Sequence, residues 1–136
     1  INGNNLQDRV VFIDGLGDEQ LAKLYSFAKF FILTPVSTKH SIEGFGMVYL
    51  EAGSCGTPVI GTFDTGAEAA IIHDHNGLLS NGNPEDVALT MTKILADENL
   101  ADRLGKGGIN RSKEFAWNKI VDMHIKHYED LLKHKT

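Results

Sequence analysis

Two glutamates, Glu43 and Glu51, carry the chemistry that this sequence suggests most directly. Seven residues separate them, and a Gly-Phe-Gly turn follows the first. Because glycine has no Cβ, a ligand can approach the backbone closely at this turn. An expected helix over residues 45–55 leaves its first N–H groups without intrahelical partners. Together with the positive end of the helix dipole, these donors form a site suited to a phosphate group.

The positions of the two carboxylates around this expected phosphate site are informative. Glu51 lies roughly 8 Å along the helix axis from Gly46, at about 1.5 Å per residue. There it can accept hydrogen bonds from two sugar hydroxyls, such as those of a ribose. Glu43 lies before the helix and can contact a second sugar. The spacing fits sugar–diphosphate–ribose, although Glu51 as a helix-surface charge and Glu43 as an N-cap carboxylate are the alternatives.

Short motifs along the chain resemble, in order, the retaining glycosyltransferases of the GT-B fold, family 4 (group 1). Glu43 and Glu51 match the E-x7-E motif of that family, which alone is a weak signal. The ordered set is specific because it covers nearly the whole chain. Its further segments are Val10–Gly15, Thr34–Ser37, Glu43–Gly46, Leu50–Ala52, Cys55–Ile60, Gly66–Glu68, Asn76–Leu79 and Asn83–Asp86.

The resemblance implies an α/β fold, a Rossmann-like parallel sheet flanked by helices, as part of the C-terminal half of a GT-B fold. Residues 1–136 are then a single domain and a fragment of the donor-binding C-terminal domain of a larger enzyme. The basic pair that holds the donor diphosphate in that family lies upstream, and no residue here takes its role. The implied activity is retaining, metal-independent hexosyl transfer from a UDP-, GDP- or ADP-sugar. The acceptor, a sugar or lipid, binds the absent N-terminal domain, so we expect the isolated chain to be inactive.

The resemblance also assigns roles to single residues. It gives Glu43 a catalytic contact with the donor sugar and Glu51 a contact with the ribose. Gly17 and Asp18 correspond to base contacts, although a plain strand–helix turn with a capping aspartate explains them equally well. The backbone N–H groups expected to contact the donor belong to Gly44, Phe45, Gly46 and Met47.

Other candidate groups are weaker. Lys39 and His40 lie in a polar loop after an expected strand, where a solvated role is the simpler interpretation. The run His73-Asp74-His75 suggests a metal ligand set, but its two imidazoles alternate and no third ligand is spaced nearby. We expect no metal site and no cofactor.

Composition excludes several classes of protein. The hydrophobic fraction of 42% is too high for a disordered tail, and no apolar run approaches the length of a membrane span. The net charge of −5 argues against nucleic-acid binding. The single cysteine, Cys55, is compatible with a reducing compartment. We expect a cytoplasmic protein, with peripheral attachment to the inner face of the membrane as the alternative.

The hydrophobic pattern alternates between strands and helices, which indicates right-handed crossovers in a parallel sheet. Strands are expected at Val10–Ile13, Phe30–Leu33, Pro58–Gly61 and Leu78–Leu79. Helices are expected at Glu19–Ala28, 45–55, 67–72, Pro84–Leu95, 98–115 with breaks at its glycines, and Trp117–Lys133.

Two other functions remain open at this level. One is a noncatalytic, truncated Rossmann-like binding or interaction module, in which an open sheet edge favours a homodimer or a partner chain. The other is a GT-B sugar-nucleotide epimerase or a glycogen phosphorylase-like enzyme, against which the surroundings of the E-x7-E motif argue.

Overall fold

The computed structural model describes residues 2–4, 6–35 and 44–133. Its sheet has three parallel strands in the order β1 (Phe31–Ile32), β2 (Val59–Thr62) and β3 (Gly77–Ser80). Phe31 pairs with Val59, and Val59 pairs with Gly77. Parallel neighbours need crossover connections, and helices α2 (Met47–Ser54) and α3 (Ala67–Ala70) lie within them. The predicted α/β class is therefore confirmed.

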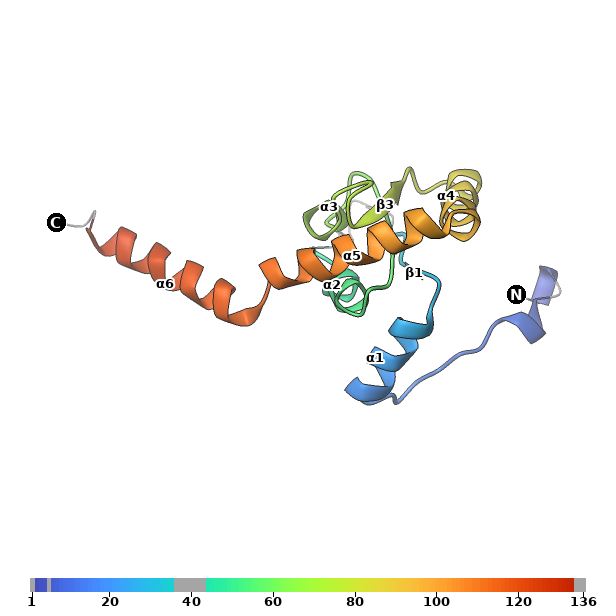
Figure 1. Ribbon diagram of the computed structural model, residues 1–136, viewed down its shortest axis with the longest axis horizontal. Coiled ribbons are helices and arrows are strands. Elements are labelled where there is room, and N and C mark those ends of the chain that lie inside the picture. Colours follow the sequence, from blue (N-terminus) through green and yellow to red (C-terminus); the bar gives the residue numbers. More distant parts are fainter. Residues whose placement is uncertain (1, 5, 36–43, 134–136) are drawn as a thin grey trace.

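The remaining helices cover the sheet or extend from it, as Figure 1 shows. Side chains alternate between the two faces of β2, so that Val59 packs in one hydrophobic cluster and Ile60 in another. The first cluster lies under α1, α2 and α3, and the second under α4 and α5. The helices outside the crossovers already named are α1 (Asp18–Phe27), α4 (Pro84–Ala96), α5 (Glu98–Glu114) and α6 (Trp117–Lys133), and two short 3-10 turns lie at Asn2–Asn4 and Gln7–Arg9.

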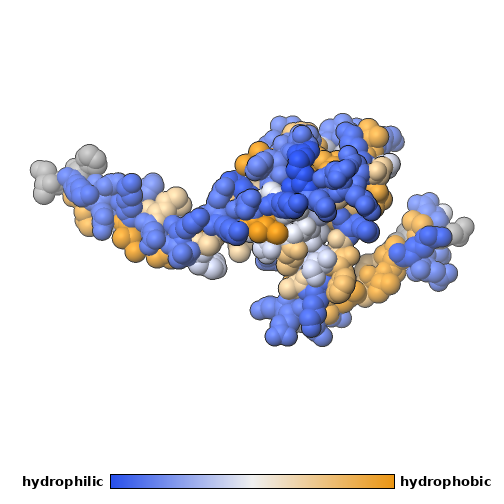
Figure 2. Space-filling model, in the orientation of Figure 1, coloured by the Kyte–Doolittle hydropathy of each residue, from blue (hydrophilic) through white to orange (hydrophobic). Residues whose placement is uncertain are grey.

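The predicted first strand, Val10–Ile13, was wrong. The segment is extended but forms no strand, and the exposed fractions of Val11 and Phe12 are 78% and 86%. Figures 1 and 2 show it as an apolar stretch that runs away from the body of the molecule. The apolar pattern indicates that these residues can be buried, but a strand also needs a neighbouring strand for its backbone hydrogen bonds. The described sheet places no strand beside this segment.

The predicted glycine breaks in residues 98–115 were also wrong, because α5 is continuous from Glu98 to Glu114. A Cβ on Gly105 would lie 2.2 Å from the carbonyl oxygen of Gly56. A Cβ on Gly108 would lie 2.9 Å from the Cα of Gly53. These glycines therefore allow α5 to approach α2 and its C-terminal turn at backbone contact distance. Burial of this contact outweighs the low helix propensity of glycine.

Other boundaries agree closely with expectation. Asn83 caps α4 by accepting a hydrogen bond from the Asp86 N–H at 2.8 Å, and α6 has its predicted bounds. The N-cap of α1 is Gly17 instead of the expected Asp18, and the Gln20 side chain accepts the Gly17 N–H at 3.0 Å. Within the described ranges, no helix is both long enough and apolar enough to cross a membrane.

Candidate functional site

The N-terminus of α2 is built on a left-handed glycine. Gly46 has φ 72° and ψ 62°, which glycine adopts without a steric penalty. A Cβ there would lie 2.5 Å from the ring of Tyr49. That ring is held in turn, because its hydroxyl donates to the carbonyl oxygen of Leu33 at 2.6 Å. A glycine is therefore required at position 46, because the chain enters α2 in a left-handed conformation against the ring of Tyr49.

The helix begins at Met47, later than the expected Phe45, because the left-handed Gly46 precedes it. Phe45 lies before the helix and packs its ring on Phe115 at a centroid distance of 5.2 Å, with Arg111 over the other aromatic ring of this pair. Phe45 therefore packs its ring within the protein, where it also contacts the first hydrophobic cluster. Its contribution to a ligand site would come from its backbone.

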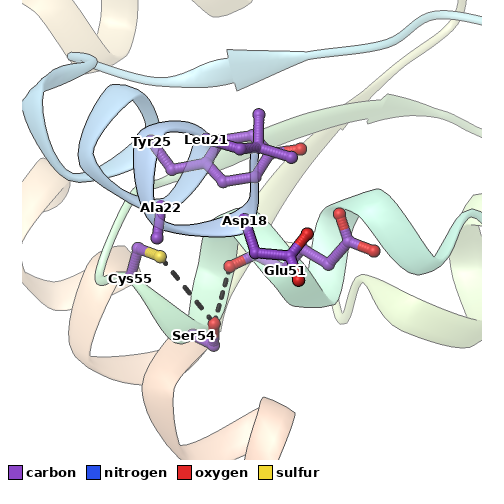
Figure 3. Close-up of a pocket in the computed structure, with 7 residues that line it drawn as sticks. All are labelled: Asp18, Leu21, Ala22, Tyr25, Glu51, Ser54 and Cys55. Carbon is purple, nitrogen blue, oxygen red and sulfur yellow. Dashed lines mark hydrogen bonds between the residues drawn. The ribbon is translucent and has the colours of Figure 1, made fainter. Parts of the chain in front are cut away.

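An open pocket of about 410 Å³ lies between α1 and α2. Asp18 on α1 and Glu51 on α2 both line it, although they are far apart in the sequence. Figure 3 shows the two helices side by side with their side chains directed into the shared space. The full lining is Asp18, Leu21, Ala22, Tyr25, Glu51, Ser54 and Cys55.

The pocket is rich in hydrogen-bond acceptors. Both carboxylate side chains, Asp18 and Glu51, are on exposed residues. Among the described residues that line the pocket there is no lysine or arginine. Burial raises the pKa of the Tyr25 hydroxyl, and the negative charge of the nearby Glu51 carboxylate raises that pKa further. The arrangement can accept hydrogen bonds from hydroxyl or amide donors, whereas a phosphate would be repelled there.

The structure brings some of the predicted site residues together and leaves others apart. Glu51 and Asp18 share the pocket, and Gly17 precedes Asp18 as the N-cap of α1. Gly44 and Met47 lie at the entry to α2, and both residues are exposed. Residues 36–43, which include the predicted Glu43, Lys39 and His40, lie outside the described part of the chain.

The apolar and hydroxyl-bearing walls of the pocket were not predicted. Positions 18, 21, 22 and 25 are spaced to share one face of a helix, and so are positions 51, 54 and 55. That spacing was available in the sequence, but for α1 it indicated a core-facing stripe. Tyr25 is indeed buried, yet it also forms the floor of the pocket.

The run His73-Asp74-His75 has a structural role. The Nδ1 atom of His73 accepts the Leu79 N–H at 2.9 Å, and the Asp74 N–H donates to the carbonyl oxygen of Gly77 at 2.8 Å. Both bonds occupy the outer edge of β3. No group of three or more potential metal ligands occurs in the part of the chain that the structure describes.

Comparison with known proteins identifies the family. An uncharacterized glycosyltransferase from Methanocaldococcus jannaschii is 33% identical over 93% of this chain and 36% of its own length. A D-inositol 3-phosphate glycosyltransferase from Streptomyces bingchenggensis is 33% identical over 85% of this chain and 25% of its own length. This chain therefore spans about a quarter to a third of these relatives.

Solved structures share the fold. Sucrose-phosphate synthase from Thermosynechococcus elongatus superposes with a TM-score of 0.82 over 98% of this chain and 33% of its own, at 34% identity. HepE from Anabaena, solved in complex with UDP-glucose, has a TM-score of 0.74 at 22% identity, over 97% of this chain and 34% of its own. These neighbours are GT-B glycosyltransferases, so the sheet and helices are those of a Rossmann-like half of that fold. The family model for glycosyl transferases group 1 matches residues 1–111, and the chain belongs to this family.

Proposed function

We propose that this chain supplies part of the donor site of a retaining glycosyltransferase that uses a nucleotide-diphosphate sugar. The observation that carries the proposal is the pocket between α1 and α2, into which Glu51 and Asp18 project. Family membership and the complex of HepE with UDP-glucose support the same class of ligand. The donor is a UDP-, GDP- or ADP-sugar.

In this proposal each part of the site contacts a different part of the donor. The Glu51 carboxylate accepts the ribose hydroxyls, because a carboxylate is an acceptor and the pocket has no cation that would compete for it among its described lining. Gly17 and Asp18 lie on the side of the base. The diphosphate lies at the N-terminus of α2, where the backbone N–H groups near Gly46 and the helix dipole favour negative charge.

The remaining contacts follow from position in the chain. Glu43, which immediately precedes Gly44, would contact the donor sugar at the reacting end. Backbone donors from Gly44 to Met47 would stabilise charge on the departing diphosphate, as preorganised donors do elsewhere. We propose that this transfer needs no metal ion, and that basic groups and the acceptor site come from chain beyond this segment. The acceptor is a sugar or a lipid.

The test is nucleotide binding by calorimetry with UDP, GDP and ADP, each in the presence of a chelator. We expect one of them to bind, and Glu51→Ala to weaken that binding about 10- to 100-fold, as for the loss of hydrogen bonds to a charged group. Glu68→Ala is the matched control, because Glu68 is also an exposed glutamate on a short helix but is not among the residues that line the pocket. If Glu51→Ala leaves the nucleotide affinity unchanged, the assignment of the nucleotide site to this pocket is wrong.

The alternative function is a noncatalytic interaction module, which predicts a different result in these experiments. The exposed apolar segment Val10–Ile13 is the observation that supports it. If no nucleotide binds and light scattering shows a dimer, the proposal of a donor site is wrong and the interaction module is favoured.

A further inference from the structure

Tyr25 is held in place by the protein on several sides. Its side chain is only 9% exposed. Its ring meets Phe31 edge-to-face at a centroid distance of 5.7 Å, and Phe31 meets Tyr49 in the same manner at 5.8 Å. Its backbone carbonyl accepts the hydroxyl of Thr57 at 2.6 Å. These contacts fix both the ring and the start of the side chain, so the hydroxyl has a defined position.

That hydroxyl is directed at the pocket. Tyr25 is the most buried of the residues that line it, and Glu51 lines the same space from α2. The pKa of Tyr25 is raised, first by burial and then by the negative charge of the nearby Glu51 carboxylate. Since an ordinary tyrosine already titrates near pH 10, Tyr25 stays protonated and acts as a donor at neutral pH.

Glu51 itself needs such a partner to be an effective ligand group. It is exposed, and its side chain has several rotatable bonds whose ordering opposes binding. A carboxylate has two oxygens and about four acceptor positions. One donor from a rigid aromatic cluster can therefore orient it and still leave acceptor positions for two vicinal hydroxyls.

We propose that Tyr25 is the positioning residue of the nucleotide site: its hydroxyl donates to one Glu51 oxygen and aims the carboxylate at the 2′ and 3′ hydroxyls of a ribose. This inference rests on the proposed function, since it assumes that Glu51 binds the ribose. It adds a specificity role, because the Tyr25–Glu51 pair distinguishes ribonucleotides from deoxyribonucleotides. Tyr25 acts through Glu51 and need not touch the ligand.

Tyr25→Phe tests this role because it removes the hydroxyl and keeps the ring in the cluster. The probes are UDP and 2′-deoxy-UDP, with the corresponding GDP and ADP pairs, titrated into the chain by calorimetry. We expect the variant to bind the ribonucleotide about three- to tenfold more weakly. Binding of the deoxy form should change much less, so that the preference for ribose shrinks.

Tyr49→Phe is the matched control. It removes a tyrosine hydroxyl from the same aromatic cluster, but that hydroxyl donates to the carbonyl oxygen of Leu33. Any effect of this change on packing should alter ribonucleotide and deoxyribonucleotide affinity equally. Thermal unfolding of both variants verifies that the fold is kept, and the double variant Tyr25→Phe/Glu51→Gln should lose no more ribose preference than Glu51→Gln alone.

The outcomes separate this inference from the function beneath it. If Glu51→Gln abolishes the ribose preference while Tyr25→Phe leaves it intact, Tyr25 has no positioning role and the donor site stands. Equal loss of affinity for both nucleotides in Tyr25→Phe would assign Tyr25 a purely structural role and overturn the inference. If Glu51→Gln changes neither affinity nor preference, the proposed function itself fails.

Discussion

The two sides of α2 are built in opposite ways. On one side, Gly53 faces Gly108 of α5, and Gly56 after the helix faces Gly105, at distances that leave no space for a Cβ on Gly105 or Gly108. On the other side, Glu51 and Ser54 face α1 across an open pocket of about 410 Å³. Figure 1 shows α5 lying along α2, whereas α1 projects away from the body.

Within this one short helix, we therefore expect one side to contribute to stability and the other side to ligand binding. The α5 side is closely packed and contains backbone atoms in contact, which cannot adjust to added volume. The α1 side is open and has polar side chains whose replacement changes few packed atoms. We therefore expect substitutions on the α5 side to lower the free energy of unfolding and substitutions on the α1 side to change ligand affinity.

The largest effect should come from Gly105→Ala on the tightly packed side. The new Cβ would lie 2.2 Å from the carbonyl oxygen of Gly56, so one backbone has to move. Alanine favours a helix over glycine by about 1 kcal/mol, but overpacking of this kind costs about 3 kcal/mol. We expect a net loss of about 2 kcal/mol in the free energy of unfolding, measured by urea denaturation.

The matched control for Gly105→Ala is Asn110→Ala, at an exposed position of the same helix. It should be neutral or slightly stabilising. Equal stability of the Gly105→Ala protein and the wild type would show that α5 can move away from α2, and the contrast between the two sides would then disappear.

The glycines of α5 also show why part of the fold was not predictable from the sequence. Glycine lowers helix propensity, so a local rule predicts breaks, yet the helix is continuous because α2 packs directly on these positions. The segment Val10–Ile13 failed for the converse reason. Its apolar, β-branched residues resemble the Val59–Ile60 pair of β2, a strand predicted to within one residue at each end. However, β2 has neighbours on both sides, whereas residues 10–13 have no strand beside them.

A smaller effect should come from the attachment of α1 to the body. The Thr57 hydroxyl, which is buried, donates to the carbonyl oxygen of Tyr25 at 2.6 Å. Thr57→Val removes this donor and leaves the carbonyl with the Ala28 N–H at 3.0 Å, so we expect a cost of about 1 kcal/mol. The free energy of unfolding should fall by that amount, and ribonucleotide affinity should fall with it because Tyr25 is displaced.

The control for Thr57→Val is Thr92→Val, whose hydroxyl donates to the Ala88 carbonyl on the exposed surface of α4. It should change the free energy of unfolding by less than about 0.5 kcal/mol. If the Thr57→Val protein is as stable as this control, the Thr57 hydrogen bond does not hold α1 against the body of the molecule.

The site was predictable to the extent that its chemistry is local. Glu51 was predicted as a site residue because its spacing from Glu43 and the glycine turn lies within one segment of chain, and the structure places it in the pocket. Tyr25 was not found as a site residue, since its position on α1 looks identical for a core residue and for a pocket wall. The contact between α1 and α2 joins the two residues, and that contact is a tertiary property that no local pattern contains.

The smallest effect should come from the solvent-exposed periphery of the α5 side. Arg103 of α5 donates to the Asp74 carboxylate at 2.8 Å and also to the Asp74 carbonyl oxygen. The hydrogen bond and charge of Arg103 hold the pKa of Asp74 below its usual value. The stabilisation is therefore fully present above the ordinary carboxyl pKa of about 3.9 and is lost as pH falls through the lowered pKa.

Asp74→Asn tests this ion pair without disturbing the backbone, because Asp74 has φ 61° and asparagine tolerates that conformation. The variant should be slightly less stable than wild type at pH 6, and the difference should shrink in acid and at high salt. Urea denaturation at several pH values measures it, with Asp102→Asn, at an exposed position of α5, as the control. A difference that persists at pH 2 would show that Asp74 stabilises the protein through contacts other than its charge. The α5 side would then depend on more than its glycines.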